Sequence, residues 1–486
     1  MGIIEKQTIK GSFWSFVGAF IAFLNVTIIM PRLFSTEQVG LVNVLVAIAT
    51  ISAQFASLGF DAVTTRMFPY FRSEKNHHHG YPFIIFLVTS CGFLLWLFIM
   101  LMGGNDLLIA QNSDKSPLLV DNLNYVIPLV LFLMAFNSLD VLYRLLYNAV
   151  IGTFLKEVVV RLLNLVLLAT YFFGVLSFDL FIFLYVAILG VPFVGLLYLL
   201  VTKEKIRFKP DFRFLTPRLK KEMFYVSFFG IVSGFSGIAI VNIDKYMVTS
   251  FLGLEQNGIY SIAFYFGTMV LLPARALKKI GASVISDAWR NNDLTLIETT
   301  YRKSALYQFL MGAVLFGGMA INLDNIAKIL PPTYATGMTV IAIIGFSNLL
   351  EMVSGQGAVL LANSIYYKVQ AFFQLLLMVL VVVTNILFIP LWGIEGAAIA
   401  TLFSNAVVLL LRALFIYLKW QIQPLDLSIV GLALTTAVAI YIAKILPYPV
   451  SDYWIVDMIF RSTLFLLIMG IGNHKILLEW WKTYRK

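Results

Sequence analysis

Long apolar stretches recur from one end of the chain to the other, separated by short polar segments. A hydrocarbon slab about 30 Å thick is crossed by roughly 20 apolar residues in helical conformation. About fourteen stretches approach that length. The pattern therefore predicts an all-α integral membrane protein with about fourteen transmembrane helices.

The predicted spans fall into two groups of six, followed by two more. The first six lie at residues 8–30, 39–60, 81–102, 125–147, 157–176 and 179–201. The next six lie at 223–250, 258–277, 305–323, 339–361, 369–391 and 393–418, and the last two at 427–445 and 454–472. The first stretch lacks the small-residue cleavage site of a secretory signal, so we expect it to be retained.

The loops differ in charge, and the difference indicates the side of the membrane. Residues 203–221 include eight Lys or Arg, whereas residues 105–122 carry three Asp against one Lys. The positive-inside rule places the basic loops in the cytoplasm and the acidic loop outside. An even number of spans then places both termini in the cytoplasm. We expect a first lobe at 1–202, a basic cytoplasmic linker at 203–221, a second lobe at 222–420, and two closing helices with a tail at 421–486.

Composition agrees with a membrane protein and excludes several other classes. The 486 residues are 60% apolar and only 12% charged, far from the balance of soluble domains. The net charge of +10 is explained by basic cytoplasmic loops, so nucleic-acid binding is not expected. Cys91 is the only cysteine, which excludes an intramolecular disulfide and a cysteine-ligated metal cluster. No Walker loop or Ser-His-Asp set is present, so we predict neither an enzyme nor a cofactor.

A short motif occurs twice, once in each predicted lobe. Residues 33–41 (LFSTEQVGL) and 251–259 (FLGLEQNGI) share the pattern Glu-Gln-x-Gly in register. Both copies lie between the first and second spans of a six-span group. Because six is even, both copies have the same orientation, which predicts a parallel repeat. The alternative is that two short outer turns use similar polar residues by chance.

Ionisable residues inside predicted spans are costly, so they are the candidate functional residues. Glu351 lies deep in the tenth span without a nearby cation in the sequence. Asp140 lies at a similar depth in the fourth span, with Arg144 one turn later on the same helix face. The alternative for this pair is a neutral structural ion pair. We place Glu351 and Asp140 among the candidates for ion coupling or gating, and Arg144 among the candidates for anion binding.

The remaining candidates lie near span ends. Asp61 and Arg66 end the second span, Arg275 ends the eighth, and Arg66 and Arg275 have the alternative of anchoring at the interface. Asp244 and Lys245 lie late in the seventh span, and Arg32 follows Pro31 at the end of the first. A diphosphate in a cavity needs several cations, so its predicted ligands are Arg32, Arg66, Arg144, Lys245 and Arg275. The candidates for ion coupling or gating are Asp61, Asp140, Asp244 and Glu351. Residues 77–79 are three histidines that we expect to be polar loop residues, with no metal site.

Several of these segments resemble the bacterial polysaccharide-biosynthesis flippases. The relevant segments are 31–33 (PRL), 37–41 (EQVGL), 58–60 (LGF), 65–66 (TR), 242–246 (NIDKY), 251–253 (FLG) and 258–261 (GIYS). This family belongs to the multidrug/oligosaccharidyl-lipid/polysaccharide exporter superfamily. The resemblance implies a V-shaped pair of six-helix lobes around a central cavity, with two extra C-terminal helices. Of the candidates, only Arg32, Arg66, Asp244 and Lys245 fall on these motifs.

The resemblance also implies a function. Similar proteins flip undecaprenyl-diphosphate-linked oligosaccharides from the cytoplasmic to the outer leaflet of the bacterial inner membrane, which we expect here by alternating access. Coupling to H⁺ or Na⁺ is left open. Expected partners are the lipid-linked substrate, membrane lipids, and the polymerase and glycosyltransferases of the same pathway. The alternatives are a multidrug or cationic-solute exporter of the same superfamily and a peptidoglycan-precursor flippase. A membrane-embedded sugar polymerase is disfavoured because the outer loops are short.

Overall fold

The computed structural model describes residues 3–73, 77–204, 206–446, 453–474, 476 and 478. All regular elements in this part of the chain are helices. Contacts divide the chain into two compact units, Met1–Gly258 and Ile259–Lys486. Helix α13 (Leu254–Thr268) begins in the first unit and continues into the second.

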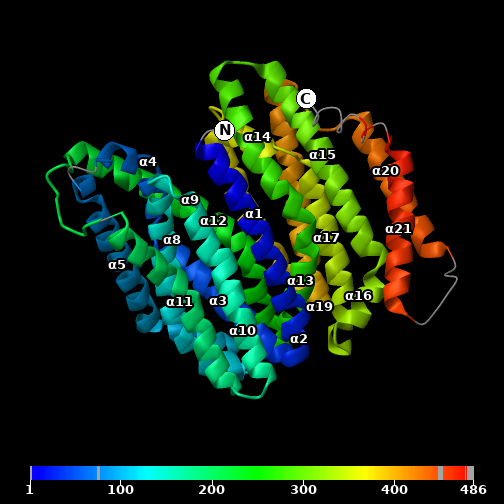
Figure 1. Ribbon diagram of the computed structural model, residues 1–486, viewed down its shortest axis with the longest axis horizontal. Helices are drawn as coiled ribbons and strands as arrows, with labels where there is room; N and C mark the ends of the chain where they lie inside the picture. Colours follow the sequence, from blue (N-terminus) through cyan, green and yellow to red (C-terminus); the bar gives the residue numbers. More distant parts are fainter. Residues whose placement is uncertain are drawn as a thin grey trace. The chain divides into compact units, whose positions relative to one another are not determined.

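The first unit holds the helices before α13, which Figure 1 colours from blue to green. Short 3₁₀ or π-helical turns, labelled η, continue several of them. In chain order these elements are α1 (Ile3–Phe23), η1 (Leu24–Ile29), α2 (Met30–Leu33), α3 (Thr36–Ala56), α4 (Phe60–Phe71), η2 (His77–Gly80), α5 (Tyr81–Ile99), η3 (Met100–Gly104), α6 (Asn105–Asn112), α7 (Pro117–Asn122), η4 (Leu123–Tyr125), α8 (Val126–Leu145), α9 (Ala149–Phe154), η5 (Leu155–Val159), α10 (Val160–Phe172), α11 (Phe178–Thr202) and α12 (Pro217–Leu252).

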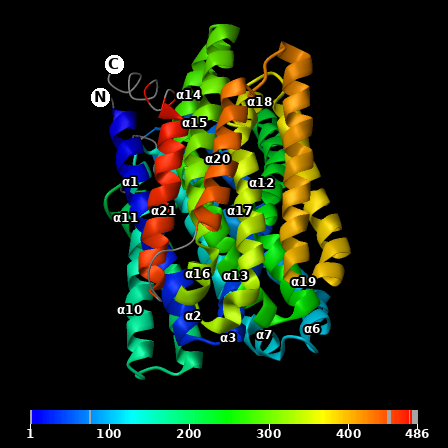
Figure 2. The ribbon, with the colours of Figure 1, turned by 90° about the vertical axis from the view of Figure 1, so that its right-hand side faces the viewer.

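The second unit continues from α13 to the end of the described chain. Its elements are η6 (Met269–Leu271), α14 (Leu272–Arg290), α15 (Leu294–Ile321), α16 (Leu323–Ile329), η7 (Pro332–Gly337), α17 (Met338–Val353), α18 (Gly357–Ala362), α19 (Tyr367–Trp420), α20 (Leu427–Ile445) and α21 (Trp454–Gly472). Helix α17 packs against both α15 and α19, and α20 and α21 lie side by side next to α15 (Figure 2).

The prediction of an all-α membrane protein is confirmed, and the predicted number of spans is close to the observed one. Among the described residues, 12 helices are long and apolar enough to cross a membrane. The difference from fourteen has two causes. Helix α19 counts once although it breaks at Trp392 and Gly393, between two predicted spans. The helical run 149–172 contains three charged residues, Lys156, Glu157 and Arg161, and does not qualify.

Two segments predicted as loops are helical. The acidic segment 105–122 forms α6 and α7, and the segment after the eighth predicted span continues as α14 to Arg290. These three helices are too polar or too short to span a bilayer by themselves, so the apolar pattern gave no signal for them. Within the predicted linker, Thr216 caps α12 by accepting a hydrogen bond from the Leu219 N–H, and Pro217 occupies the first helical position.

The core of the first unit lies where α4, α5, α8 and α11 meet. Tyr81 is fully buried there and packs against Phe60, Phe68 and Phe71. Helix α12 follows the predicted linker in sequence. It nevertheless packs along α3 and belongs to the first unit. Close packing of large side chains stabilises the association of these helices, because lipid offers no hydrophobic driving force between them.

The two copies of the repeated motif meet each other. Helices α3 and α13 both begin at the fourth residue of the motif, Thr36 and Leu254. A Cβ added to Gly40 would collide with the Leu254 carbonyl oxygen, and a Cβ added to Gly258 would collide with the Thr36 carbonyl oxygen. Asn257 Nδ2 also donates to the Gly40 carbonyl at 3.1 Å. Such reciprocal contacts are those of a local two-fold axis and agree with the predicted repeat.

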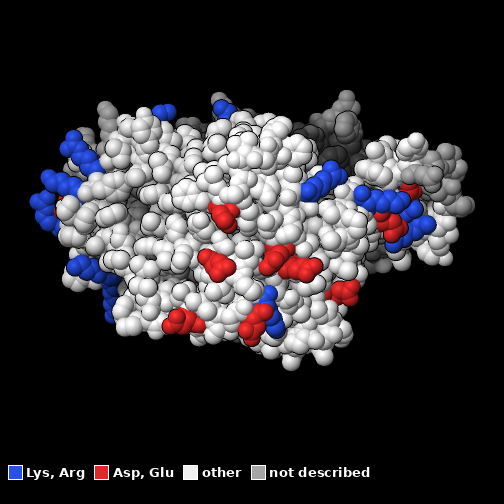
Figure 3. All heavy atoms as spheres, turned by 90° about the horizontal axis from the view of Figure 1, so that it is seen from below, with Lys and Arg blue, Asp and Glu red and all other residues white. Residues whose placement is uncertain are grey.

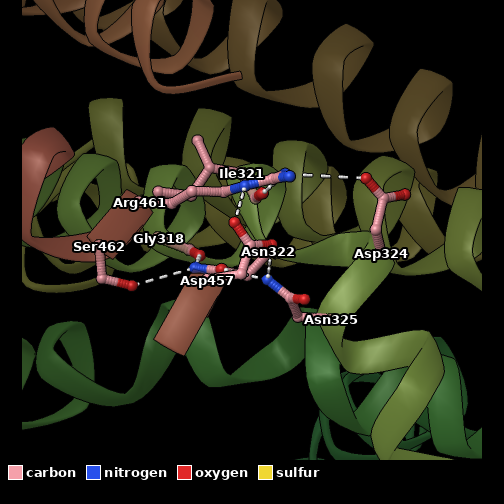
Figure 4. A network of polar contacts seen from close by, with 8 residues as sticks. All are labelled: Gly318, Ile321, Asn322, Asp324, Asn325, Asp457, Arg461 and Ser462. Carbon is pink, nitrogen blue, oxygen red and sulfur yellow. Dashed lines mark hydrogen bonds and ion pairs between the residues drawn. The ribbon is translucent and has the colours of Figure 1, made fainter. Parts of the chain in front are cut away.

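A polar network attaches the last helix to the rest of the second unit (Figure 4). Asp457 in α21 accepts hydrogen bonds from Arg461 Nε at 2.7 Å and from Asn325 Nδ2 at 2.8 Å. The Arg461 guanidinium also donates to the Ile321 carbonyl at 3.1 Å. Both charged groups are therefore paired and hydrogen-bonded, as groups removed from water need to be.

We predict that Gly40→Ala lowers the melting temperature of the purified protein in detergent. The new methyl group has no space against the Leu254 carbonyl, and overpacking of this kind costs about 1–3 kcal/mol. Gly431→Ala in α20 is the matched control, because a Cβ there meets no described atom within 4 Å, and alanine favours a helix by about 0.5–1 kcal/mol over glycine. Equal melting temperatures for the two variants would contradict the tight crossing.

Candidate functional site

Two predicted acids and one predicted arginine come together on α4 and α8. Ser138 Oγ donates to Asp61 Oδ1 at 3.1 Å, which joins the two helices. Asp140, half a turn further along α8, forms an ion pair with Arg144 Nε at 3.1 Å. Arg144 and Asp140 both interact electrostatically with Asp61. We call Asp61, Asp140 and Arg144, with Arg66 described below, the inner cluster.

The surroundings of Asp140 include a lysine that the sequence prediction missed. Lys156 of η5 interacts electrostatically with Asp140 and lies 5.7 Å from the Phe136 ring centre. Gly152 faces Asp140 so closely that any side chain there would overlap Oδ1. Within the described residues, this buried Oδ1 accepts no hydrogen bond. A carboxylate with one oxygen paired and the other unsatisfied is a suitable place for a proton or a small cation.

The arginines of the inner cluster are accessible. The Arg144 side chain is 51% exposed despite its ion pair. Arg66 of α4 is 66% exposed and lies 3.8 Å from Glu222, near the start of α12. Exposed ion pairs of this kind contribute little to stability. Both guanidinium groups can therefore exchange a carboxylate for a phosphate at small cost.

The other predicted cations of the first unit lie at the opposite end. Asp244 and Lys245 are 1% and 6% exposed, near the end of α12. Lys245 follows Glu222 by 23 residues (245 minus 222) on the same helix, which corresponds to roughly 35 Å along the axis. One diphosphate cannot contact Arg66 and Lys245 together, so the predicted binding residues form two groups and not one site.

The end of the first unit that holds Lys245 also contains Arg32, exposed at the end of α2. The turn that follows is fixed by Ser35 and Gln38, which exchange side-chain and backbone hydrogen bonds at the start of α3. Beside this turn, Lys115 Nζ donates to the Phe251 carbonyl at 2.8 Å. These contacts link the first motif, the acidic segment and the second motif at this end.

In the second unit, Glu351 has partners from other helices. Lys278 Nζ of α14 donates to Glu351 Oε1 at 2.6 Å. Arg412 of α19, 9% exposed, interacts electrostatically with both Glu351 and Tyr301. The carboxylate is paired with Lys278 and interacts electrostatically with Arg412, so it is not an isolated acid. Neither cation is within one turn in the sequence, so only the tertiary structure could identify them.

Some predicted residues contribute differently or cannot be placed. The Arg275 side chain lies outside the described part of the chain. His78 is buried, and its Nδ1 accepts a hydrogen bond from the Ser73 N–H, whereas the His79 ring stacks on Phe214 at 4.4 Å. The described residues contain no group of three or more His, Cys, Asp or Glu side chains suited to a metal ion. Cys91, on an apolar helix, is exposed rather than packed inside the unit.

Charged side chains are sparse on the surface as well. On the face seen in Figure 3, they stand in small groups among uncharged residues. Exposed apolar side chains are numerous in the spans, as they are in a protein surrounded by lipid. The charged clusters are therefore exceptions that need an explanation in function or in packing.

Comparison with known proteins identifies a family and a fold. A family described as polysaccharide biosynthesis protein matches residues 8–273. No curated protein matches the chain.

Three solved structures have a similar fold. The lipid II flippase MurJ in an inward closed conformation is 12% identical, with a TM-score of 0.76 over 96% of this chain and all of that chain. An inward-facing multidrug resistance MATE family transporter of the MOP superfamily is 13% identical, with a TM-score of 0.64 over 84% of this chain and 94% of that one. A MOP superfamily transporter from Pyrococcus furiosus is 14% identical, with a TM-score of 0.54 over 86% and 96%.

We predict an energetic coupling between Lys278 and Glu351 of about 1 kcal/mol in a double-mutant cycle with Lys278→Ala and Glu351→Gln. Both side chains are partly exposed, which limits the value. The surface pair Glu298–Arg302 on α15 is the control, with an expected coupling of about 0.3–0.5 kcal/mol. Thermal unfolding of the single and double variants measures both. Additive effects at Lys278 and Glu351 would show that the contact is not energetically significant.

Proposed function

Because the chain belongs to the polysaccharide biosynthesis protein family, we propose that it moves undecaprenyl-diphosphate-linked oligosaccharides across the membrane. The chain is a multi-pass membrane protein of the MOP superfamily, whose fold is that of transporters and flippases. In this proposal the substrate passes from the cytoplasmic to the outer leaflet. The family match carries the assignment of a lipid-linked sugar, and the separated cation groups support a diphosphate as the recognised part.

Arg66 and Arg144 are the proposed first contact of the diphosphate. Both are exposed, and each is held near an acid. A diphosphate leaves water only where cations replace its hydration, and guanidinium groups do this with paired hydrogen bonds. Lys245 and Arg32 then take part at the other end of the first unit. The sugar and diphosphate need a hydrated path, whereas the prenyl chain remains in lipid.

Alternating access fits this separation of cations. Two conformations that expose first the inner cluster and then Lys245 and Arg32 would transfer the diphosphate from one end of the unit to the other. Asp140 and Glu351 would bias the two states by taking up a proton or a cation. The coupled ion is H⁺ or Na⁺ in this proposal, and no other cofactor or covalent step is required.

The proposed location is the bacterial inner membrane, with both termini in the cytoplasm. The basic segment between α11 and α12 and the inner cluster share one side, which the positive-inside rule makes cytoplasmic. The substrate would arrive there from glycosyltransferases and leave on the other side to a polymerase. Membrane lipids surround the remaining surface.

A second candidate substrate is lipid II. The similarity to the lipid II flippase MurJ, with a TM-score of 0.76, favours it. Both substrates carry a prenyl chain on a diphosphate, so the cation groups do not distinguish them. A cationic-solute exporter, suggested by the similarity to MATE transporters, would be served less well by paired arginines.

We predict that Arg66→Ala with Arg144→Ala reduces flipping of a fluorescent undecaprenyl-diphosphate oligosaccharide in proteoliposomes by at least about tenfold. A charge-assisted hydrogen bond contributes roughly 1.5–3 kcal/mol. Arg302→Ala, which removes an exposed arginine from a comparable i,i+4 pair on α15, should retain the wild-type rate. Lipid II flipped faster than the oligosaccharide by wild-type protein would transfer the assignment to the second candidate. Export of a cationic dye, with neither lipid flipped, would overturn both.

We predict that Glu351→Gln impairs transport while expression stays near wild type and the melting temperature falls only by the loss of the Lys278 ion pair. The substitution keeps the shape of the side chain but removes the charge that pairs with Lys278 and interacts electrostatically with Arg412. Flipping rates measured with and without an imposed pH or Na⁺ gradient would locate the defect. A variant that retains the full rate and the full response to the gradient would remove Glu351 from the mechanism.

A further inference from the structure

A groove in the first unit runs between α5, α8 and α11. Its volume is about 580 Å³. It lies in three membrane-spanning helices and is lined almost entirely by apolar side chains. They include Phe86, Phe93, Leu131, Ala135 and Phe193. Phe86 is exposed at its edge, which places the groove in contact with lipid.

The segment between α11 and α12, a loop in Figure 1, contributes Phe208 to the lining of this groove. Ile206 is buried in the core and anchors the segment, while its N–H donates to the Leu200 carbonyl at 3.0 Å. Phe208 then lies over Phe86 at 6.4 Å, and Phe212 contacts Phe83 edge-on at 5.9 Å. The aromatic residues of the segment thus face the first turns of α5.

A second, polar cavity begins where the groove ends. Its volume is about 560 Å³, and its basic residues are His77, His79, Lys209 and Arg213. Two chain segments, the one between α11 and α12 and the start of α5 with the turn before it, contribute residues to both cavities. Phe208 lines the groove and Lys209 the polar cavity. Likewise, Phe83 of α5 lines the groove, and Gly80 of η2, three residues earlier, lines the polar cavity. The linings of the apolar groove and of the basic cavity therefore come within one helical turn of each other.

Asp211 is the acid of the polar cavity, and it is already paired. Its Oδ1 accepts hydrogen bonds from Arg213 Nε at 3.1 Å and from the Arg213 N–H at 3.2 Å. These bonds hold the pKa of the Asp211 carboxyl below its usual value. Gly80 has φ of +70°, and a Cβ there would meet the Asp211 backbone nitrogen at 2.7 Å, so glycine allows the segment to pack against α5. Lys209 is exposed, and none of these hydrogen bonds joins it to Asp211.

We propose that these two cavities bind one anionic phospholipid of the surrounding membrane, with an acyl chain in the groove and the phosphate headgroup at Lys209 and Arg213. Such a lipid matches the two cavities both in charge and in position relative to the bilayer. Apolar walls lie within the spanning helices, whereas the cations lie on the segment that the positive-inside rule makes cytoplasmic. Basic pockets at that interface suit anionic headgroups. This lipid is a resident ligand, and its binding is independent of the substrate proposed above.

The test is native mass spectrometry of the purified full chain titrated with phosphatidylglycerol or phosphatidylcholine. Each basic residue near an anionic lipid contributes roughly a fivefold change in affinity. Lys209→Ala with Arg213→Ala should therefore weaken phosphatidylglycerol binding by about tenfold or more. Arg218→Ala with Lys220→Ala, which removes two exposed cations of α12 outside the cavity, should leave it within twofold of wild type.

Two further variants make the result independent of misfolding. Asp211→Asn removes the competing carboxylate and should tighten phosphatidylglycerol binding about threefold, which a damaged protein would not do. Ala135→Phe fills the groove and should weaken both lipids, with Ser90→Phe at the same groove as the alternative if that variant does not fold. Unchanged phosphatidylglycerol affinity in the Lys209→Ala/Arg213→Ala variant would overturn the proposal. Displacement of the lipid by equimolar undecaprenyl phosphate would also overturn it, because the site would then belong to the substrate.

Discussion

The cost of placing charge in hydrocarbon governs the arrangement of this protein. A charged side chain at the centre of a membrane helix costs at least about 2.5 kcal/mol on insertion scales. Three of the candidate acids accordingly have a partner: Asp61 has Ser138, Asp140 has Arg144, and Glu351 has Lys278. In the first unit, Arg66 and Arg144 lie at one end and Lys245 and Arg32 at the other. A polyanionic headgroup that crosses the membrane would thus find cations at both ends of this unit.

The fold also depends on close backbone packing, because lipid does not drive helices together. At the end of the first unit that holds Lys245, Gly40 and Gly258 each lie on the backbone of the other motif. The same end holds the contact of Lys115 with the Phe251 carbonyl. These contacts join elements from both copies of the repeat within one compact unit. They locate the repeat in three dimensions as well as in the sequence.

Much of the fold could be predicted from the sequence, since hydrophobic length and the positive-inside rule act locally. The spans, the motif repeat and the break of α19 near Gly393 all leave a signal in neighbouring residues. The helices α6, α7 and α14 left none, because they are short or amphipathic. The candidate site was predicted less well. Asp140 and Arg144 are four residues apart and were recognised as a pair, whereas Lys278 and Arg412 approach Glu351 from helices 73 and 61 residues away in sequence (351 minus 278, and 412 minus 351). Residue spacing cannot reveal such partners, nor could it show that Arg66 pairs with Glu222, which is roughly 35 Å from Lys245 along α12.

The most direct test of the central claim is made in cells depleted of this protein. Spheroplasts would be treated with a glycosidase that cannot cross the membrane, and lipid-linked oligosaccharides would then be quantified by mass spectrometry. If the protein is the flippase, the undecaprenyl-diphosphate oligosaccharide accumulates in depleted cells and stays protected from the enzyme, whereas in wild-type cells it is digested. An intermediate that does not accumulate, or that is digested equally in both, would contradict the account.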